Sequence, residues 1–365
     1  MTKAINQGIS ALDEDGKAVD WWFVYKIPKL GKSANSPASN GYEYIYYDSS
    51  IKKIVQSPNL LTDGKGALDL TLKSIFDKPT DNMGWILYND EMPKDVDRSD
   101  SSNWGHTKGV LAFDTATKTA LWLLHSWPKY VDPESSKMPT PAYGQTFMCI
   151  SLDLETASKI AAQMINHQTP QVYSPRIPKN MDKSDPLYII SQPFDPRPKA
   201  DSDVLSYKSR GGLDFKLIAK NKKWNKDFWN DLVGPTLKTN INIESWIRGK
   251  KPPTPDSDGI HKTFDVKYID LRPLGFPWVW SETHDHAKWG ISVDSDWVCV
   301  GDINRMVSQR KRGGGTIAFQ DPTLWTALSK TDLIVAPPGH TVVEAKRLIK
   351  ETHTNTHLPQ EKNKR

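Results

Sequence analysis

Residues 106–126 read HTKGVLAFDTATKTALWLLHS, and residues 286–304 read HAKWGISVDSDWVCVGDIN. Each stretch opens with a histidine and a lysine two positions apart, followed by an apolar run, a polar turn and a second apolar run. This pattern is typical of a β-hairpin. Asp114 and Asp294 stand at the same place after the histidine, and about half of the 365-residue chain separates the two hairpins. The sequence therefore predicts two related halves, each built around one hairpin.

Further strands and helices are expected on both sides of the hairpins. The predicted strands are 19–28, 42–48, 85–90, 143–152 and 313–319, and the predicted helices are 153–166, 322–332 and 341–353. Residues 226–249 suggest short helices and loops. A segment dense in proline and charge follows residue 166 and is predicted to separate the halves. We expect an α/β (α+β) fold with halves at 1–166 and 167–353, each a mixed β-sheet flanked by helices, and a polar tail at 354–365.

Composition gives only broad limits. The chain carries 48 basic and 43 acidic residues, a formal net charge of +5, which favours anionic partners only weakly. Cys149 and Cys299 lie in apolar strands and are predicted to be buried free thiols. No apolar run is long enough to span a membrane, and the first twenty residues lack the apolar core of a signal peptide. We therefore expect no membrane association.

The paired hairpins suggest phosphodiester chemistry. Alternate residues of a strand share a face about 6.5–7 Å apart, so His106 lies beside Lys108 and His286 beside Lys288. The returning strand of each hairpin brings Ser126 or Asn304 to the same end as the histidine. If the two units face one another, two lysines can stabilise a phosphate, one histidine can attack it and the other can protonate the leaving oxygen. Such a site needs no metal or other cofactor.

Other interpretations remain open at this stage. His284, Asp285 and His286 could form a metal site, and both hairpins could be ordinary exposed structure. The Arg310–Gly315 segment could bind an anion through its charges and glycine N–H groups, or be a solvated turn. Lys220, with its neighbours Lys222 and Lys223, is interpreted as surface charge. His125 fits a structural role as well as a site role.

The motifs together resemble the acid deoxyribonuclease II family of the phospholipase D-like superfamily. The resemblance rests on WGHTKGVLAFD with WLLHSWP, on HDHAKW with WVCVGDINR and RGGGT, and on VDWWFVYKIP, ILYND and YGQTFMCIS in the same order. It implies two phospholipase D-like halves related by a pseudo-twofold axis. It also implies a metal-independent endonuclease that cuts double-stranded DNA at acidic pH and leaves 3′-phosphate ends.

The resemblance also assigns roles to residues. His106 and Lys108 would form one half-site and His286 and Lys288 the other, with the nucleophile in the first motif. Asn304 matches a supporting asparagine, and Ser126 is its nearest counterpart in the first half. Substrate-binding roles are expected for Ser126, Arg312 and Gly313.

Compartment and assembly stay open. The family implies a secreted or lysosome-like acidic location, although no signal peptide is expected here. One chain would hold both half-sites, as a monomer with an internal pseudo-dimer or within a homodimer. The rival functions are a phospholipase, a metal-dependent nuclease using His284, Asp285 and His286, and a DNA-binding module without turnover.

Overall fold

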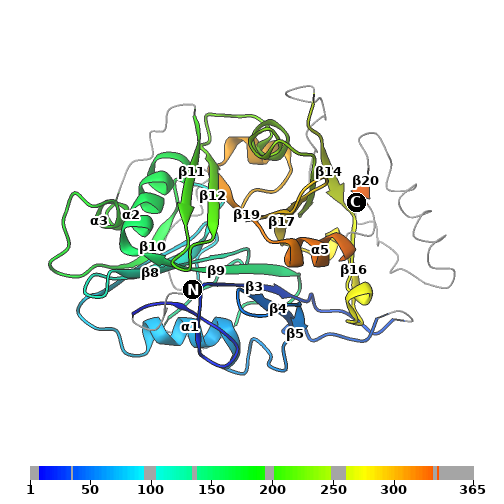
Figure 1. Ribbon diagram of the computed structural model, residues 1–365, viewed down its shortest axis with the longest axis horizontal. Coiled ribbons are helices and arrows are strands. Elements are labelled where there is room, and N and C mark those ends of the chain that lie inside the picture. The colour runs from blue at the N-terminus through cyan, green and yellow to red at the C-terminus, as the bar shows by residue number, and fades with distance from the viewer. Residues whose placement is uncertain are drawn as a thin grey trace.

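The computed structural model describes residues 8–33, 36–93, 104–133, 138–193, 201–247 and 260–331, and the backbone of strand β20 (Val335–Ala336). The fold is mixed α/β, with two main sheets and few helices (Figure 1). The predicted helix at 341–353 and the tail at 354–365 lie outside the described residues.

The first sheet has the order β10-β6-β7-β8-β9-β3-β4-β5, with antiparallel neighbours throughout. Its strands are β3 (Trp21–Lys26), β4 (Tyr44–Asp48), β5 (Val55–Gln56), β6 (Met83–Asn89), β7 (Lys108–Asp114), β8 (Thr119–His125), β9 (Gln145–Asp153) and β10 (Val172–Arg176).

The second sheet has the order β11-β12-β19-β18-β17-β13-β14-β20, and it is mixed because β13 and β14 run parallel. Besides β20, its strands are β11 (Ser202–Lys208), β12 (Asp214–Lys220), β13 (Ile241–Ser245), β14 (Thr263–Val266), β17 (Lys288–Ser292), β18 (Trp297–Gly301) and β19 (Gly314–Gln320).

Two small antiparallel pairs and the helices complete the described structure. The pairs are β1 (Ala11–Leu12) with β2 (Ala18–Val19) and β15 (Tyr268–Asp270) with β16 (Val279–Ser281). The α-helices are α1 (Gly66–Phe76), α2 (Leu154–Gln163), α3 (Pro186–Ser191), α4 (Gly234–Leu237) and α5 (Pro322–Thr331). The π-helices are η1 (Met164–Gln168) and η2 (Trp229–Val233), and the 3₁₀ helices are η3 (Arg272–Leu274), η4 (Glu282–His284) and η5 (Val307–Lys311).

Both predicted hairpins are confirmed, as β7-β8 and β17-β18. They hold the same place in sheets of the same central order, which is β6-β7-β8-β9-β3 in the first and β13-β17-β18-β19-β12 in the second. A helix also follows the equivalent strand in each case, with α2 after β9 and α5 after β19. The Asp153 side chain caps α2 by accepting a hydrogen bond from Thr156 N, as expected for an acidic helix start.

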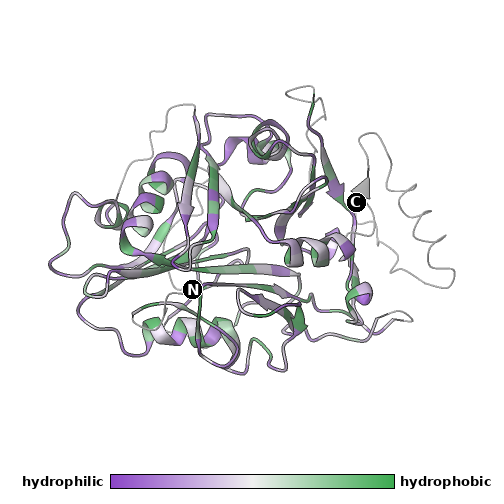
Figure 2. Ribbon diagram, viewed as in Figure 1, coloured by the Kyte–Doolittle hydropathy of each residue, from purple (hydrophilic) through white to green (hydrophobic). Residues whose placement is uncertain are grey.

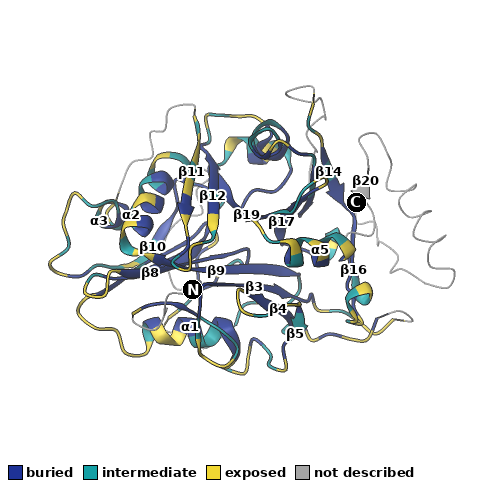
Figure 3. Ribbon diagram, in the orientation of Figure 1, coloured by how far each residue is buried: buried dark blue, intermediate teal, exposed yellow. Residues whose placement is uncertain are grey.

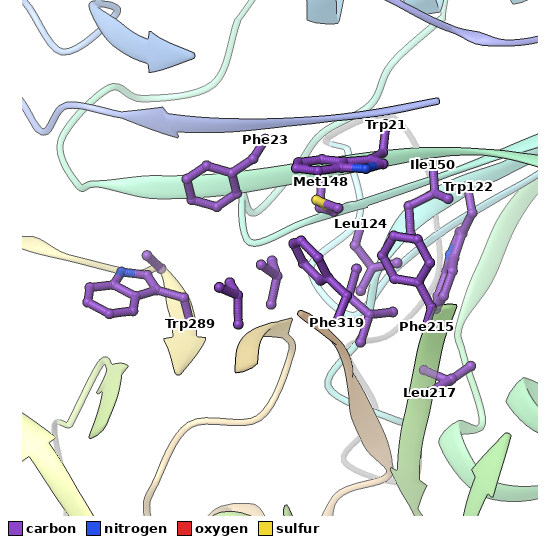
Figure 4. Packing of buried hydrophobic residues seen from close by; sticks show 14 of the residues in the cluster. Trp21, Phe23, Trp122, Leu124, Met148, Ile150, Phe215, Leu217, Trp289 and Phe319 are labelled. Atoms are coloured by element: carbon purple, nitrogen blue, oxygen red, sulfur yellow. The ribbon is translucent and has the colours of Figure 1, made fainter. Parts of the chain in front are cut away.

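A shared apolar core joins the two sheets. Trp21 and Phe23 of β3 face the second sheet, and the ring of Trp21 meets Phe319 of β19 edge-on at 5.2 Å (Figure 4). Figure 2 shows the hydrophobic residues along the strands, and Figure 3 shows the same strands as the buried part of the molecule. Burying large aromatic side chains stabilises such an interface by about 2 kcal/mol each. This core holds the two motif hairpins in one rigid frame.

The outer faces of the sheets have cores of their own. α1 covers the first sheet, where Leu68 and Ile75 pack against strand residues. η2 covers the second sheet through Trp229 and Val233. Cys149 and Cys299 are buried free thiols on β9 and β18, which confirms the prediction.

Candidate active site

The hairpin registers place the two motifs in equivalent positions. Lys108 pairs with Asn89 of β6, and Lys288 pairs with Ser245 of β13. The residues that follow these partners, Asp90 and Trp246, are therefore counterparts. The same comparison makes Tyr143 and Gly144, just before β9, the counterparts of Arg312 and Gly313, just before β19.

Each motif histidine is tied to the opposite sheet through its main chain. The N–H of His106 donates to the carbonyl of Gly313 over 2.8 Å, and the N–H of His286 donates to the carbonyl of Gly144 over 2.9 Å. Gly144 and Gly313 are equivalent positions, so the two cross-links are reciprocal. The order of strands in each sheet thus brings both motifs to the boundary between the sheets.

His106 is held at its Nδ1 atom. Nδ1 lies 2.6 Å from the main-chain oxygen of Asp302, which can only accept, so Nδ1 carries the proton and Nε2 carries the lone pair. Burial lowers the pKa of His106 to about 3; Asp90 opposes this shift, while Lys108, Lys288 and Arg312 add to it. The imidazole is therefore neutral at mildly acidic pH. The charge of Lys288 reaches His106, so the two motifs share one electrostatic environment.

Asp90 organises the charges around His106. Its Oδ1 accepts from Lys108 Nζ, its Oδ2 accepts from Arg312 Nη2 over 3.1 Å, and Oδ2 lies 3.8 Å from His106 Nε2. These cations hold the pKa of Asp90 well below its usual range despite burial, which acts in the opposite direction. Arg312 also donates to the carbonyl of Gly105, over 3.0 Å. The first half-site is therefore a network of buried charges.

His286 lies in aromatic surroundings instead. Its ring stacks on Tyr143 with centroids 4.1 Å apart and planes 7° from parallel, and the Trp246 ring approaches it at 3.8 Å. Lys288 Nζ donates to the His286 carbonyl. Burial lowers the pKa of Lys288 to about 8, and the charge of Lys108 adds to this effect. The counterparts of Asp90 and Arg312 are thus aromatic, so the two half-sites differ in chemistry although they agree in position.

Asp302 lies between the half-sites. It follows β18, its main-chain oxygen binds His106, and its carboxyl group accepts the main-chain N–H of Lys108. Burial raises the pKa of Asp302 to about 8, against the opposing charge of Lys108. At acidic pH this carboxyl is therefore neutral.

The remaining predicted site residues have different surroundings. Arg312 and Gly313 contact the first half-site directly, as described above. Ser126 is buried and binds the side chain of Gln145 and the main chain of Thr146, so its hydroxyl links β8 to β9. Asn304 is buried, and its Oδ1 has no hydrogen-bond partner among the described residues. The register makes Pro128, rather than Ser126, the counterpart of Asn304.

The metal hypothesis finds little support in the contacts of Asp285. Its Oδ2 accepts from the Tyr25 hydroxyl and from Trp280 Nε1 at 2.7 Å, and its Oδ1 accepts from Ala287 N at 2.7 Å. Both oxygens already accept hydrogen bonds from protein groups, and these bonds fix the main chain before Lys288. Within the described ranges, no group of three or more His, Cys, Asp or Glu residues is placed to hold a metal ion.

Lys220 corrects one interpretation from the sequence. It was expected at the surface, but it ends β12 and its side chain is 0% exposed. Strand β12 lies between β11 and β19, and its last four residues are buried, which the neighbouring lysines in the sequence do not reveal. His125 is likewise buried, and its Nδ1 accepts from the main-chain N–H of Trp127 over 3.2 Å. That contact favours a structural role for His125.

Four residues of the site, Asp90, Asp302, Tyr143 and Trp246, were not identified from the sequence. Asp90 ends the ILYND motif, and its place after an apolar strand is a signal that could have been used. Tyr143 and Trp246 carried no such signal, because aromatic residues are usually core. A cavity of about 420 Å³ lies on the outer side of the second half-site, lined by Lys29, Ala142, Tyr143, Thr283 and His284.

Comparisons with known proteins identify the family. A family model described as deoxyribonuclease II matches residues 10–337. The chain is 62% identical over 345 residues to the "Putative deoxyribonuclease-2" of Burkholderia pseudomallei strain K96243, covering 94% of this chain and 98% of that protein. It is 31% identical over 333 residues to deoxyribonuclease-2-alpha of Rattus norvegicus, covering 88% of this chain and 92% of the relative.

Caenorhabditis elegans has a deoxyribonuclease-2 that is 32% identical over 357 residues, covering 88% of this chain and 92% of that protein. No helix among the described residues is long and apolar enough to span a membrane. The family match confirms the resemblance drawn from the motifs and makes DNA the substrate. The chain therefore belongs to the deoxyribonuclease II family and is a deoxyribonuclease II-type endonuclease, a hydrolase.

Proposed function

We propose that the chain cleaves double-stranded DNA without a metal ion, through a covalent intermediate on His106, and leaves 3′-phosphate ends. The observation that carries this proposal is the reciprocal pair of links between the motifs, from His106 N to Gly313 O and from His286 N to Gly144 O. Two His-x-Lys units at equivalent register lie at one boundary, and the charge of Lys288 reaches His106, which supports the proposal that both act on one phosphate.

His106 is the better nucleophile. A nucleophilic imidazole must be neutral and must present a lone pair, and burial together with the Nδ1 contact to Asp302 favours that form. Its Nε2 attacks phosphorus, a P–N bond forms, and the bond from phosphorus to the O5′ atom breaks. The product still attached to the enzyme is a phosphohistidine that carries the upstream fragment of the cut strand through its O3′ atom.

His286 supplies and removes the protons. It donates a proton to the departing O5′, which leaves as a hydroxyl group. The neutral His286 then takes a proton from water, the water oxygen attacks phosphorus, and the P–N bond breaks. This second step releases the 3′-phosphate and restores both histidines.

The lysines supply the positive charge that the transition state needs. Lys108 and Lys288 are buried at the start of their motif strands, and the charge of Lys108 helps burial to lower the pKa of Lys288. Buried cations stabilise the developing charge on phosphate oxygens more strongly than solvated cations do. Asn304, with its Oδ1 available, is proposed to orient the substrate or the attacking water. The Ser126 hydroxyl is already hydrogen-bonded to Gln145, so we propose that Ser126 supports the site indirectly, by fixing the start of β9.

The equal strand order supports two pseudo-twofold related phospholipase D-like halves. β10 belongs to the first sheet and β11 begins the second, so the proposed division at 166/167 falls inside η1 and before the last strand of the first sheet. Because one chain contributes both motifs, we propose that a monomer is competent, and that a homodimer is not required for chemistry.

Plasmid nicking at pH 5 in excess EDTA tests the proposal. The parent should nick the plasmid, whereas His106→Ala and His286→Ala should each lose at least about a hundredfold in rate. His261→Ala, which alters a histidine beside Gly234, is the control and should retain activity. Retained activity in either motif variant contradicts the assignment, activity that EDTA abolishes favours a metal-dependent nuclease, and DNA bound but never cut favours a binding module.

A second measurement addresses the intermediate. With an oligonucleotide whose 3′-phosphate is esterified to p-nitrophenol, the leaving group needs little protonation. His286→Ala should then release p-nitrophenol once and remain covalently attached to the oligonucleotide, because hydrolysis of the phosphohistidine still needs His286. His106→Ala should form no attachment. Attachment to His106→Ala would instead place the nucleophile elsewhere.

A further inference from the structure

Two buried lysines occupy equivalent positions outside the His-x-Lys motifs. Lys26 ends β3 and Lys220 ends β12, and both side chains are 0% exposed. Lys26 pairs with Gln145 at the start of β9, and Lys220 pairs with Gly314 at the start of β19. Lysine is almost never fully buried without partners, so each of these side chains has a specific role in its surroundings.

The Lys26 ammonium donates hydrogen bonds to three main-chain oxygens. Its Nζ donates to the carbonyls of Ile27 over 3.1 Å, Pro141 over 3.0 Å and Tyr143 over 2.6 Å. An ammonium group has three N–H donors, so all of them are used. Two of the three acceptors lie in the loop 141–144, which leads into β9.

Lys220 repeats this arrangement in the second sheet. Its Nζ donates to the carbonyls of Gln309 over 3.0 Å, of Arg310 over 3.1 Å, and of Arg312. Arg310 and Arg312 are the register counterparts of Pro141 and Tyr143. Lys220 therefore holds the loop 310–313 as Lys26 holds the loop 141–144.

Each loop supports one motif histidine through two of its residues. In the loop 141–144, Tyr143 stacks on the ring of His286, and Gly144 accepts its main-chain N–H. The ammonium of Lys26 binds the carbonyl of Tyr143 itself, so it fixes the residue whose ring supports the imidazole.

The loop 310–313 does the same for His106. Gly313 accepts the main-chain N–H of His106, and Arg312 binds Asp90, whose carboxylate lies 3.8 Å from His106 Nε2. Lys220 binds the carbonyl of Arg312. Each lysine thus binds the carbonyl of the residue that precedes the glycine aligning a histidine.

We propose that Lys26 and Lys220 are positioning residues for the two half-sites, Lys26 for His286 and Lys220 for His106. They touch no reacting atom; they fix the loops that orient the imidazoles. The inference rests on the proposed function, because it assigns Lys26 to the histidine that protonates the leaving group and Lys220 to the nucleophilic histidine. Burial lowers the pKa of each lysine to about 7, so both ammonium groups keep all three donors at acidic pH.

The different roles of the histidines allow a selective test. If His286 protonates the leaving group, a less firmly oriented His286 should slow the cleavage of DNA, because the 5′-hydroxyl of DNA is a poor leaving group. It should matter far less for thymidine 3′-(p-nitrophenyl phosphate), whose phenolate leaves without protonation. If His106 is the nucleophile, loosening it should slow bond cleavage in both substrates alike.

The experiment uses Lys26→Met and Lys220→Met in the full chain, with first-turnover cleavage rates measured at pH 5. Lys26→Met should lose about tenfold to a hundredfold on DNA and less than about threefold on the p-nitrophenyl ester. Lys220→Met should lose about tenfold to a hundredfold on both substrates. A purely structural role would lower both rates of both variants equally.

Two further variants guard against simple unfolding. Lys26→Gln and Lys220→Gln keep two N–H donors and should show the same substrate pattern with smaller losses if the methionine variants do not fold. Gln163→Met is the matched control: Gln163 is buried and donates to Asp203 Oδ2 over 2.8 Å and to the Leu217 carbonyl over 3.1 Å, away from both loops. It should lower the melting temperature without changing either rate below that temperature.

The outcomes separate the two proposals. Equal losses on both substrates in every lysine variant, or unchanged rates in folded variants, overturn the positioning roles. If His106→Ala or His286→Ala keeps full activity, the proposed mechanism itself fails, whatever the lysine variants do. Loss in both histidine variants without the predicted substrate pattern removes only the lysine assignment.

Discussion

Arg312 and Asp90 join the two sheets beside His106, through a hydrogen bond of 3.1 Å between Nη2 and Oδ2. Asp90 also balances Lys108, so one carboxylate serves two cations that are largely buried. Asp90→Asn should therefore lower the free energy of unfolding by about 3–5 kcal/mol, because it leaves buried cations without a counter-ion. Urea denaturation at pH 5 measures this change.

The matched control for that experiment is Asp214→Asn. Asp214 pairs with Lys208 at the exposed end of β11 and β12, where both side chains are well solvated. Removing an exposed pair should change the free energy of unfolding by no more than about 1 kcal/mol. Similar losses in both variants would show that Asp90 is not the centre of a buried charge network.

Tyr143 should affect catalysis through its ring and not through its hydroxyl. Its stacking on His286 at 4.1 Å holds the imidazole plane, and such aromatic contacts contribute about 0.5–1.5 kcal/mol. We expect Tyr143→Phe to keep the parent kcat on plasmid DNA and Tyr143→Ala to lose about threefold to tenfold. A large loss in Tyr143→Phe would mean that the hydroxyl participates directly.

Asp302 should make stability depend on pH in an unusual direction. Its pKa rises from an ordinary value of 3.8 to about 8 in the folded chain, so the folded state binds the proton more tightly than the unfolded state. The stability it contributes is complete below pH 3.8 and is lost as pH rises to about 8. Asp302→Asn removes this dependence.

Urea denaturation of both proteins at pH 5, 6, 7 and 8 checks this prediction. Relative to Asp302→Asn, the free energy of unfolding of the parent should fall by up to about 1.4 kcal/mol for each unit by which pH rises. Other groups titrate in both proteins and cancel in the difference. Parallel stability curves for the two proteins would contradict the assignment.

Gly313 should tolerate no side chain. A Cβ atom there would lie 2.4 Å from the carbonyl oxygen of Gln168, which is main chain and cannot move away easily. Gly313→Ala should cost about 1–3 kcal/mol of stability and should disturb the link to His106. Gly31→Ala is the control, because no heavy atom lies within 4 Å of its Cβ position. Thermal unfolding and plasmid nicking of both variants measure the effects.

The cavity beside Tyr143 offers a place for DNA next to the cleaved phosphate. Lys29 lines this cavity and is exposed, so a charge reversal there should weaken substrate binding without touching the histidines. Lys29→Glu should raise KM for plasmid DNA, lower the salt dependence of binding by about one unit of slope, and leave kcat unchanged. Lys118→Glu, in the exposed turn of the first hairpin, should leave KM unchanged at the same ionic strength.

The sequence predicted the hairpins because their apolar runs and turns are local signals. β7, β8, β17 and β18 lie where the patterns placed them, and α2 and α5 begin at or next to their predicted starts. β13 was not predicted, because INIES alternates weakly and owes its burial to neighbours on both sides. The pair β11-β12 was missed as well, since lysines at 208, 216 and 220 obscure its alternation.

The site was predictable only where its residues repeat. His106, Lys108, His286 and Lys288 could be found because two copies of a spacing support each other. Asp90 and Lys220 act through contacts with residues more than 80 positions away, and no local pattern encodes such a contact. The asymmetry between a charged and an aromatic half-site likewise emerges only when the two sheets are superposed by register.

The link from His106 to Gly313 has a consequence for the chain during synthesis. The first motif is translated early, yet the glycine that aligns it is more than 200 residues downstream. A ribosome-bound chain that ends before β19 therefore lacks the glycine that aligns His106, although Gly144, which aligns His286, has already been made. Nuclease activity should appear abruptly, once Gly313 and β19 have emerged, so products of translation that end earlier would pose no threat to the nucleic acid around them.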